Sequence, residues 1–178
     1  MKTHIPLIFL LSLLFYSCEN DLAVVHDFAV GAKHPSEVIY DAVVLYSDSA
    51  LVKVRLTAPK MEHYIEKRPY VELTEGINLV FYDVDGEITS HLTAEYAINY
   101  ENEGKLEAKG DVVLINELGE KLNTEHLIWL QEEERIYSEV FVKITTEDEI
   151  IMGDGFESNE SFTNFKITHI TGTILVED

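Results

Sequence analysis

The sequence predicts an all-β domain in which repeated, kinked hairpins form two facing antiparallel sheets. Three observations lead to this prediction. From Val43 onward, short runs rich in Val, Ile, Thr, Tyr and Phe alternate with polar residues, which is typical of strands with one buried face. Turn signals separate these runs at Asp85-Gly86, Glu103-Gly104 and Leu118-Gly119. One segment also recurs along the chain, which is typical of repeat architectures.

The N-terminal segment has the pattern of an export signal. Lys2 precedes an apolar run from Ile5 to Tyr16, which ends at Ser17 and Cys18. The run is 12 residues long, whereas a helix needs roughly 20 apolar residues to cross a membrane. We therefore predict a lipoprotein signal peptide over residues 1–17, with an uncleaved short membrane anchor as the alternative.

Cys18 is the only cysteine, so no disulfide can form within the chain. Its position after the apolar run resembles that of the lipobox cysteine in bacterial lipoproteins, which is acylated. Two or more acyl chains anchor a protein stably, because each buried CH₂ contributes ~0.8 kcal/mol. Residues 18–37, interrupted by Gly31 and Pro35, are predicted to form a lipid-anchored tether, and residues 38–178 the β domain.

Four repeat units follow one another in the domain. Arg55–Tyr64 recurs 36 residues later as His91–Tyr100, and looser copies begin at Lys121 and Ile151. In each unit a two-residue step between apolar or small positions becomes a three-residue step, which one face of a regular strand cannot accommodate. Each unit is therefore predicted to contain a bulge or bend, at Ala58, Ala94, Thr124 and Gly153. Helical periodicity competes only over residues 125–134.

Each unit also carries a second strand with alternating apolar residues. Because side chains alternate with a period of two, one face of these strands is predicted to line the interior of the domain. The positions in register are Ile77, Leu79, Val112, Leu114, Val140, Val142 and Leu175. Such residues either fill a closed sandwich core or line an open groove, and periodicity alone does not distinguish the two.

Several of these segments together resemble the LptC family, the periplasmic component of lipopolysaccharide export that belongs with the OstA-like proteins. The segments are Leu-Thr-Ala at 92–94, Gly-Asp-Val-Val-Leu at 110–114, Leu-Asn-Thr-Glu at 122–125 and Gly-Asp-Gly-Phe at 153–156. The resemblance implies a half-open β-jellyroll whose apolar interior shelters the acyl chains of lipopolysaccharide. It extends the lipid-binding lining to four further positions, Phe81, Ile98, Ile128 and Ile144.

The resemblance also implies a non-enzymatic relay. Lipopolysaccharide would come from an inner-membrane ABC transporter and pass to a periplasmic bridge protein, an LptA-like jellyroll that joins by edge-to-edge strand pairing. The C-terminal run Thr171–Val176 is the candidate edge, because strand addition needs an unpaired edge; a fully paired final strand is the alternative. The best-known branch of the family has a transmembrane helix, whereas this chain is expected to be a periplasmic lipoprotein of the inner membrane.

The composition argues against several other functions. The formal net charge of −20 disfavours a nucleic-acid partner, because binding phosphates requires clustered Lys and Arg. The sequence has no His-Glu-x-x-His, paired-cysteine, phosphate-loop or nucleophile-elbow motif, so we predict no cofactor, metal site or catalytic residue. Asp83–Gly86 matches only the start of a calcium loop and is predicted to be a hairpin turn.

Two alternatives to the relay stay open. The first is a lipid-anchored β scaffold with a closed core that binds an envelope protein or glycan. The second is an enzyme acting on envelope polysaccharide, which would need carboxylates gathered in a cleft. Asp111, Glu139 and Asp154 are the candidates for that role, and we expect them to lie in turns instead.

Overall fold

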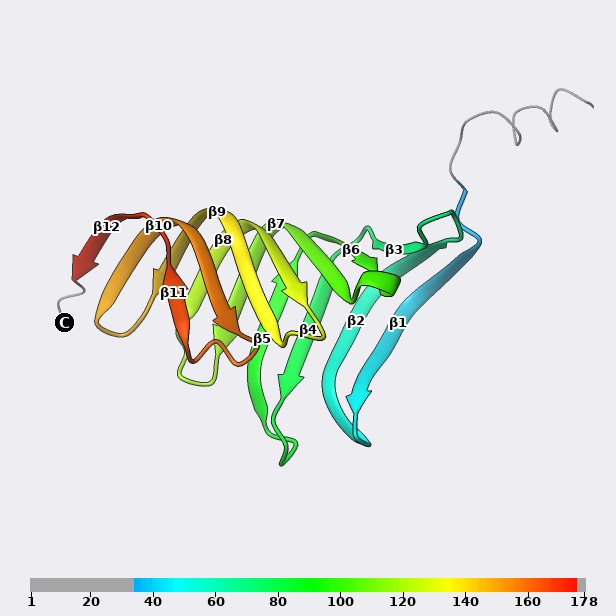
Figure 1. The fold of residues 1–178 in the computed structure, drawn as a ribbon, viewed down its shortest axis with the longest axis horizontal. Coiled ribbons are helices and arrows are strands. Elements are labelled where there is room, and N and C mark those ends of the chain that lie inside the picture. The colour runs from blue at the N-terminus through cyan, green and yellow to red at the C-terminus, as the bar shows by residue number, and fades with distance from the viewer. Residues whose placement is uncertain (1–33, 176–178) are drawn as a thin grey trace, which may run out of the picture. The chain divides into compact units, whose positions relative to one another are not determined.

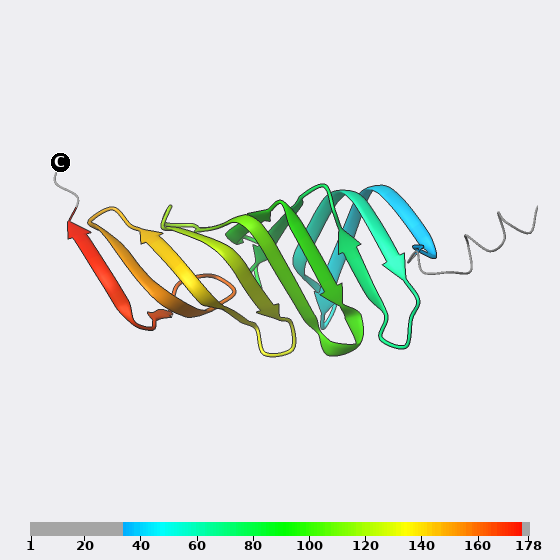
Figure 2. The same ribbon diagram turned by 90° about the horizontal axis from the view of Figure 1, so that it is seen from above.

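Twelve antiparallel strands form one continuous sheet in the computed structural model, which describes residues 34–175. The strands follow one another in a row from β1 and β2 at one end to β12 at the other (Figures 1 and 2). The predicted all-β fold is confirmed. The elements are β1 (Glu37–Asp48), β2 (Leu51–Tyr64), β3 (Tyr70–Leu73), β4 (Ile77–Tyr82), β5 (Ile88–Ala94), β6 (Tyr96–Tyr100), the 3₁₀ helix η2 (Glu101–Glu103), β7 (Lys105–Asn116), β8 (Lys121–Leu130), β9 (Arg135–Thr145), β10 (Glu149–Asn159), β11 (Phe165–Ile167) and β12 (Ile170–Leu175).

The long strands cross a bend and take part in two facing halves of this sheet. β7, for example, pairs with β6 through residues 105–109 and with β5 through residues 113–116. We call the two halves the first wall and the second wall. The first wall contains β4, β5, residues 112–116, 121–124, 142–145 and 149–154, and β12. The second wall contains β3, β6, residues 105–109, 127–130, 135–138 and 156–159, and β11.

The bends lie at or close to the positions that the repeat predicted. β5 ends at Ala94, and the pairing of β8 with β9 is interrupted after Thr124. β10 shifts register against β12 at Gly153 and against β9 around Gly155, where φ is +95°, a value that glycine adopts without strain. β2 continues through Ala58 but changes partner there from β4 to β3. The two expected sheets are therefore halves of one sheet, because the long strands run through the bends. Residues 125–130 belong to strand β8.

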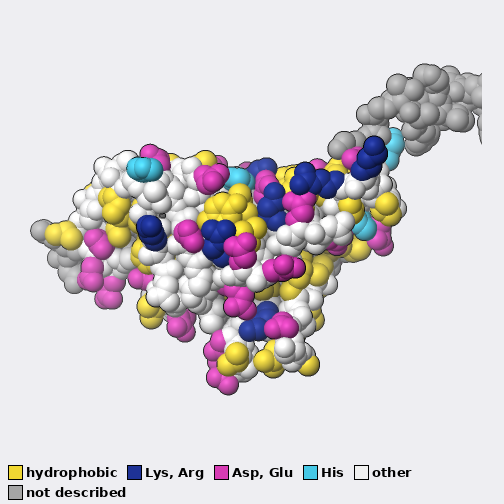
Figure 3. Space-filling view, in the orientation of Figure 1, with side chains coloured by type: hydrophobic (Ala, Val, Ile, Leu, Met, Phe, Trp, Pro, Cys, Tyr) yellow, Lys and Arg dark blue, Asp and Glu magenta, His cyan; other side chains and the backbone are white. Residues whose placement is uncertain are grey.

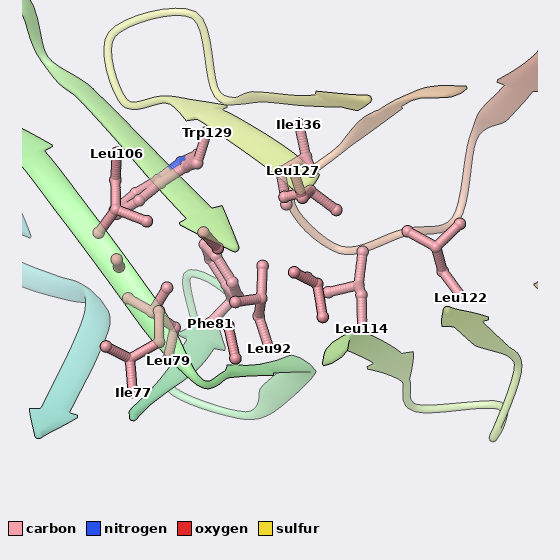
Figure 4. Packing of buried hydrophobic residues seen from close by; sticks show 14 of the residues in the cluster. Ile77, Leu79, Phe81, Leu92, Leu106, Leu114, Leu122, Leu127, Trp129 and Ile136 are labelled. Carbon is pink, nitrogen blue, oxygen red and sulfur yellow. The ribbon is translucent and has the colours of Figure 1, made fainter. Parts of the chain in front are cut away.

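Apolar side chains from both walls fill the space between them (Figure 4). Phe81 of β4 and Trp129 of β8 pack edge to face with ring centroids 5.4 Å apart, although their strands are not neighbours in the sheet. This geometry is favourable for aromatic pairs. The contact shows that the two walls face each other directly and that the core of the protein lies between them.

A second, smaller cluster lies on the outer face of the second wall. Tyr64 and Tyr70 stack with centroids 4.8 Å apart, and Tyr100 is partly buried against them. The Lys105 ammonium lies 4.6 Å from the centre of the Tyr100 ring, close enough for a cation–π interaction. In Figure 3, an apolar patch on the upper part of the molecule has basic and acidic side chains around it.

Glu107 of β7 binds two lysines of the same strand. Its carboxylate oxygens are 2.9 Å from Lys105 Nζ and 3.0 Å from Lys109 Nζ. Burial acts to raise the pKa of Glu107, but the hydrogen bonds from Lys105 and Lys109 outweigh it and hold the pKa at about 2. The ionised carboxylate therefore stabilises the folded state.

We expect the Glu107→Gln variant to be less stable than the wild type at pH 7 by about 1 kcal/mol, the size of a good partly exposed ion pair. Because the folded pKa lies below the unfolded value, the stabilisation is complete above pH ~4.5 and is lost as the pH falls towards 2. The difference between the two proteins should therefore shrink over this pH range in thermal unfolding. Glu125→Gln, an exposed change on β8, is the control and should show no such convergence.

The fully buried Leu114 of β7 allows a test of the core. We expect Leu114→Ala to lower the free energy of unfolding by about 2–5 kcal/mol, because it leaves a cavity between the walls. Leu118→Ala removes the same atoms from a side chain that is 73% exposed in the next turn, and should change stability by less than about 0.5 kcal/mol. Urea unfolding measures both. Equal losses would contradict the position of the core.

Candidate functional site

The candidate site is the apolar interior between the walls. Seven of the residues predicted to line it belong to the buried cluster there, and all seven come from the first wall. They are Ile77, Leu79, Phe81, Val112, Leu114, Val142 and Ile144. Leu106, Leu127 and Trp129 face them from the second wall. The interior therefore extends along the row of strands and is lined almost wholly by hydrocarbon.

Two other predicted residues are buried on the opposite side of the sheet. Ile98 packs against Tyr64 and Tyr70 in the outer cluster, because its neighbour Ala97 takes the inward position on β6. Ile128 is flanked on β8 by two inward side chains, Leu127 and Trp129, and so points outward. Neither residue lines the interior, since alternation along a strand places neighbours on opposite faces.

Val140 and Leu175 also lie outside the interior. Val140 is 39% exposed because it sits in the interrupted pairing between β8 and β9, where the bend breaks the alternation that places Val142 and Ile144 inside. Leu175 is 74% exposed at the end of β12, which pairs with β10 at the end of the row. Sequence periodicity alone, without the positions of the bends, could not show that Val140 and Leu175 lie outside the interior.

Both walls end in turns on one side of the fold, and we call this side the mouth. A pocket of about 410 Å³ opens there, between the β1–β2 hairpin and the turn that follows β8. Tyr46, Val54 and Trp129 form its apolar part. The mouth pocket borders the interior, because Trp129 contacts both Tyr46, at a centroid distance of 5.6 Å, and Phe81.

Hydrogen bonds hold the aromatic side chains at the mouth. Asn99 Nδ2 donates to the Tyr46 hydroxyl over 3.2 Å, and Gln131 Nε2 donates to Asn99 Oδ1 over 3.2 Å. Burial, together with the charge of Glu101, raises the pKa of Tyr46, so the phenol stays neutral. The network connects β1, β6 and the turn after β8, and it orients the Tyr46 ring against Trp129.

Glu160 provides the polar partner of Trp129. The indole Nε1 donates to Glu160 Oε1 over 2.6 Å. Burial raises the pKa of the Glu160 carboxyl, and this hydrogen bond acts in the opposite direction. Three more glutamates, Glu132–Glu134, and Asp48 lie around the same pocket, and Lys53 is the one cation that residues 34–175 place there. The rim therefore disfavours anions, while the floor is apolar.

The candidates for other chemistry lie elsewhere. Asp83 Oδ1 accepts hydrogen bonds from the backbone of Asp85 and Glu87, each over 2.9 Å, which confirms the predicted hairpin turn between β4 and β5. Asp111, Glu139 and Asp154 are exposed within strands, at or near their bends, and not in turns as expected. Within residues 34–175, no group of three or more His, Cys, Asp or Glu side chains is placed to hold a metal ion.

Sequence reasoning missed the inward-facing residues of the second wall and the residues of the mouth. Trp129 and Leu127 were not predicted to line the interior, although the spacing Leu127-x-Trp129 carries the signal of a strand face. Tyr46 and Glu160 had no signal, because their proximity to Trp129 depends on how the walls fold over each other. The same holds for Phe162, a buried residue of the loop between β10 and β11.

A folded antiparallel sheet with an apolar interior and a mouth along one side defines a β-jellyroll protein suited to holding an apolar ligand. The family described as lipopolysaccharide-assembly, LptC-related, matches residues 6–174, nearly the whole chain, and the protein belongs to this LptC family. A search of curated proteins finds no match. Family membership assigns the chain to lipopolysaccharide transport in the cell envelope, on the side that faces the periplasm.

The predicted signal peptide and Cys18 lie outside the described residues. Within residues 34–175, no helix has the length and hydrophobicity needed to span a membrane. The lipid anchor therefore stays a prediction from the sequence.

Proposed function

We propose that this protein is a non-enzymatic relay that binds the acyl chains of lipopolysaccharide between its walls. It would take the lipid from an inner-membrane ABC transporter and pass it to a periplasmic LptA-like jellyroll. The observation that carries the proposal is the apolar interior, which extends along the row of strands and draws side chains from both walls. Each acyl CH₂ buried there would gain ~0.8 kcal/mol.

The ends of the row support the relay part of the proposal. Among residues 34–175, β1 pairs with β2 alone and β12 pairs with β10 alone, so each has one free edge. Ile170, Ile174 and Leu175 are exposed on β12. A free strand edge accepts a strand from another protein by β-augmentation. Edge-to-edge pairing at β12 would continue the apolar interior into the bridge protein.

The charge at the mouth bears on how the lipid binds. The acidic rim disfavours the phosphates of lipopolysaccharide, whereas the apolar floor favours its acyl chains. We propose that the head group stays in solvent, where salt screens charges farther apart than about 8–10 Å.

The density of the interior supports a second candidate function. The described interior is filled by side chains, several of them fully buried, as in a closed core. A lipid-anchored β scaffold that binds an envelope protein or glycan would need no more than this. The relay requires that the interior open to admit an acyl chain, and lipid capture inside the walls separates the two functions.

We expect photo-cross-linking to capture lipopolysaccharide from interior positions in living cells. A diazirine amino acid close in size to leucine at Leu114 or Val142, or benzoylphenylalanine at Phe81, should each give a lipid adduct detectable by immunoblotting. Ile115, the outward neighbour of Leu114 on β7, is the matched control and should give none. Capture at none of the three interior positions would reject the relay and leave the scaffold.

The membrane anchor is tested separately. We propose that Cys18 carries the lipid that holds the protein in the inner membrane. The Cys18→Ala variant should lose incorporation of radiolabelled palmitate and should accumulate as an uncleaved precursor, because cleavage follows acylation in lipoproteins. Labelling of Cys18→Ala at the wild-type level would contradict the anchor.

A further inference from the structure

The loop between β10 and β11 crosses the mouth from the second wall to the first. Two of its backbone carbonyls accept hydrogen bonds from the first wall: Glu160 O from Ser90 Oγ over 2.6 Å, and Phe162 O from Asn116 Nδ2 over 2.9 Å. The Glu160 carboxylate accepts the indole hydrogen bond of Trp129 from the second wall. We call residues 160–164 the strap. It connects the ends of the two walls.

The strap inserts a phenyl ring into the interior. Phe162 is fully buried, and its ring centroid lies 5.6 Å from that of Phe156 and 5.2 Å from that of Phe165. Its φ of +52° is in the left-handed region, which bulky residues rarely adopt. Asn159 Oδ1 supports this turn by accepting hydrogen bonds from the backbone N–H groups of Thr163 and Asn164.

Phe162 differs from the rest of the interior in where it comes from. Within residues 34–175, every other buried member of the interior cluster belongs to a strand. A strand cannot leave the interior without breaking the backbone hydrogen bonds that pair it in the sheet, whereas the strap is joined to the first wall by side-chain hydrogen bonds from Ser90 and Asn116. Its withdrawal would vacate a space next to Phe156 and leave both walls in place.

The contacts of the strap are suited to release. Ser90, Asn116 and the two carbonyls are groups that water can satisfy once the mouth opens. Burial raises the pKa of Glu160, so the closed position disfavours its ionised form. Glu160 also borders the mouth pocket beside Trp129. The pocket therefore offers an entry route alongside the strap.

We propose that the strap occupies an acyl-chain subsite, in which Phe162 takes the place of lipid hydrocarbon until the strap swings out. This inference rests on the proposed function, since it assumes that acyl chains enter between the walls. The mouth next to Glu160 would be the entrance for acyl chains. The displaceable ring of Phe162 would keep the interior free of water when no lipid is bound.

A reversible lock tests the strap. Glu117 and Thr163 are exposed, and each follows one partner of the Asn116–Phe162 hydrogen bond. We introduce Glu117→Cys and Thr163→Cys into the full chain that carries benzoylphenylalanine at Phe81, and join them with a thiol-cleavable bismaleimide. The protein is held in phosphatidylethanolamine–phosphatidylglycerol vesicles and given purified lipopolysaccharide.

The lock should abolish lipid capture at Phe81, and reductant should restore it. The two single-cysteine variants, treated with the same reagent, should capture lipid like the unlocked protein, which controls for reaction with Cys18. If the yield of lipid capture is equal with the strap cross-linked and with the strap released, the inference about the strap is wrong. The proposed relay function would not be affected. No capture in the unlocked protein from any of the three interior positions, Phe81, Leu114 and Val142, would instead reject the proposed function itself.

A second variant does not depend on cross-linking the strap. Phe162→Ala should raise the yield of lipid capture at Phe81 several-fold, because the subsite is already vacant. Ile98→Ala removes buried hydrocarbon from the outer cluster and controls for a general loss of stability. It should lower the melting temperature without raising capture. A Phe162→Ala protein that melts cooperatively and captures lipid no better than the wild type would contradict the inference.

Discussion

The structure depends on apolar contact between the two walls across the interior. The edge-to-face pair of Phe81 and Trp129 is its most direct instance, since the two residues come from strands that share no hydrogen bonds. Burial of hydrocarbon on both sides offsets the entropy of bending long strands. The bends, the mouth and the strap all follow from this requirement, because a sheet with one apolar face is stable in water only when that face is covered.

The same contact shapes the function of the fold. A sandwich closed on all sides would hide its hydrocarbon permanently, and an open groove would expose it to water. This chain lies between the two cases, because one aromatic side chain of its interior, Phe162, comes from a loop. If Phe162 yields to an acyl chain as we propose, the interior would be dry without lipid and a lipid would compete for the same surface. Membership of a lipopolysaccharide-transport family is consistent with that proposal.

Charge has a different role from hydrocarbon in this molecule. Among residues 34–175 the cations near the outer tyrosine cluster are paired with glutamates, as Glu107 is with Lys105 and Lys109. At the mouth the described part of the chain places several carboxylates and only Lys53 beside them. Neither surface concentrates positive charge, so recognition of the lipid by its phosphates is disfavoured. Affinity for lipid would therefore come from the interior, and the acidic surface would keep the protein soluble and the head group outside.

The sequence by itself determined the strands, the bends at or near Ala94, Thr124 and Gly153, and five inward positions of the first wall, because these depend on local alternation and on its interruption. It also carried enough of the family pattern to indicate the LptC family. Only the tertiary structure decided that Val140 and Leu175 face solvent, that Trp129 closes the interior from the opposite wall, and that Phe162 enters it from a loop. These features join residues far apart in the chain, and local periodicity carries no information about which distant surfaces meet.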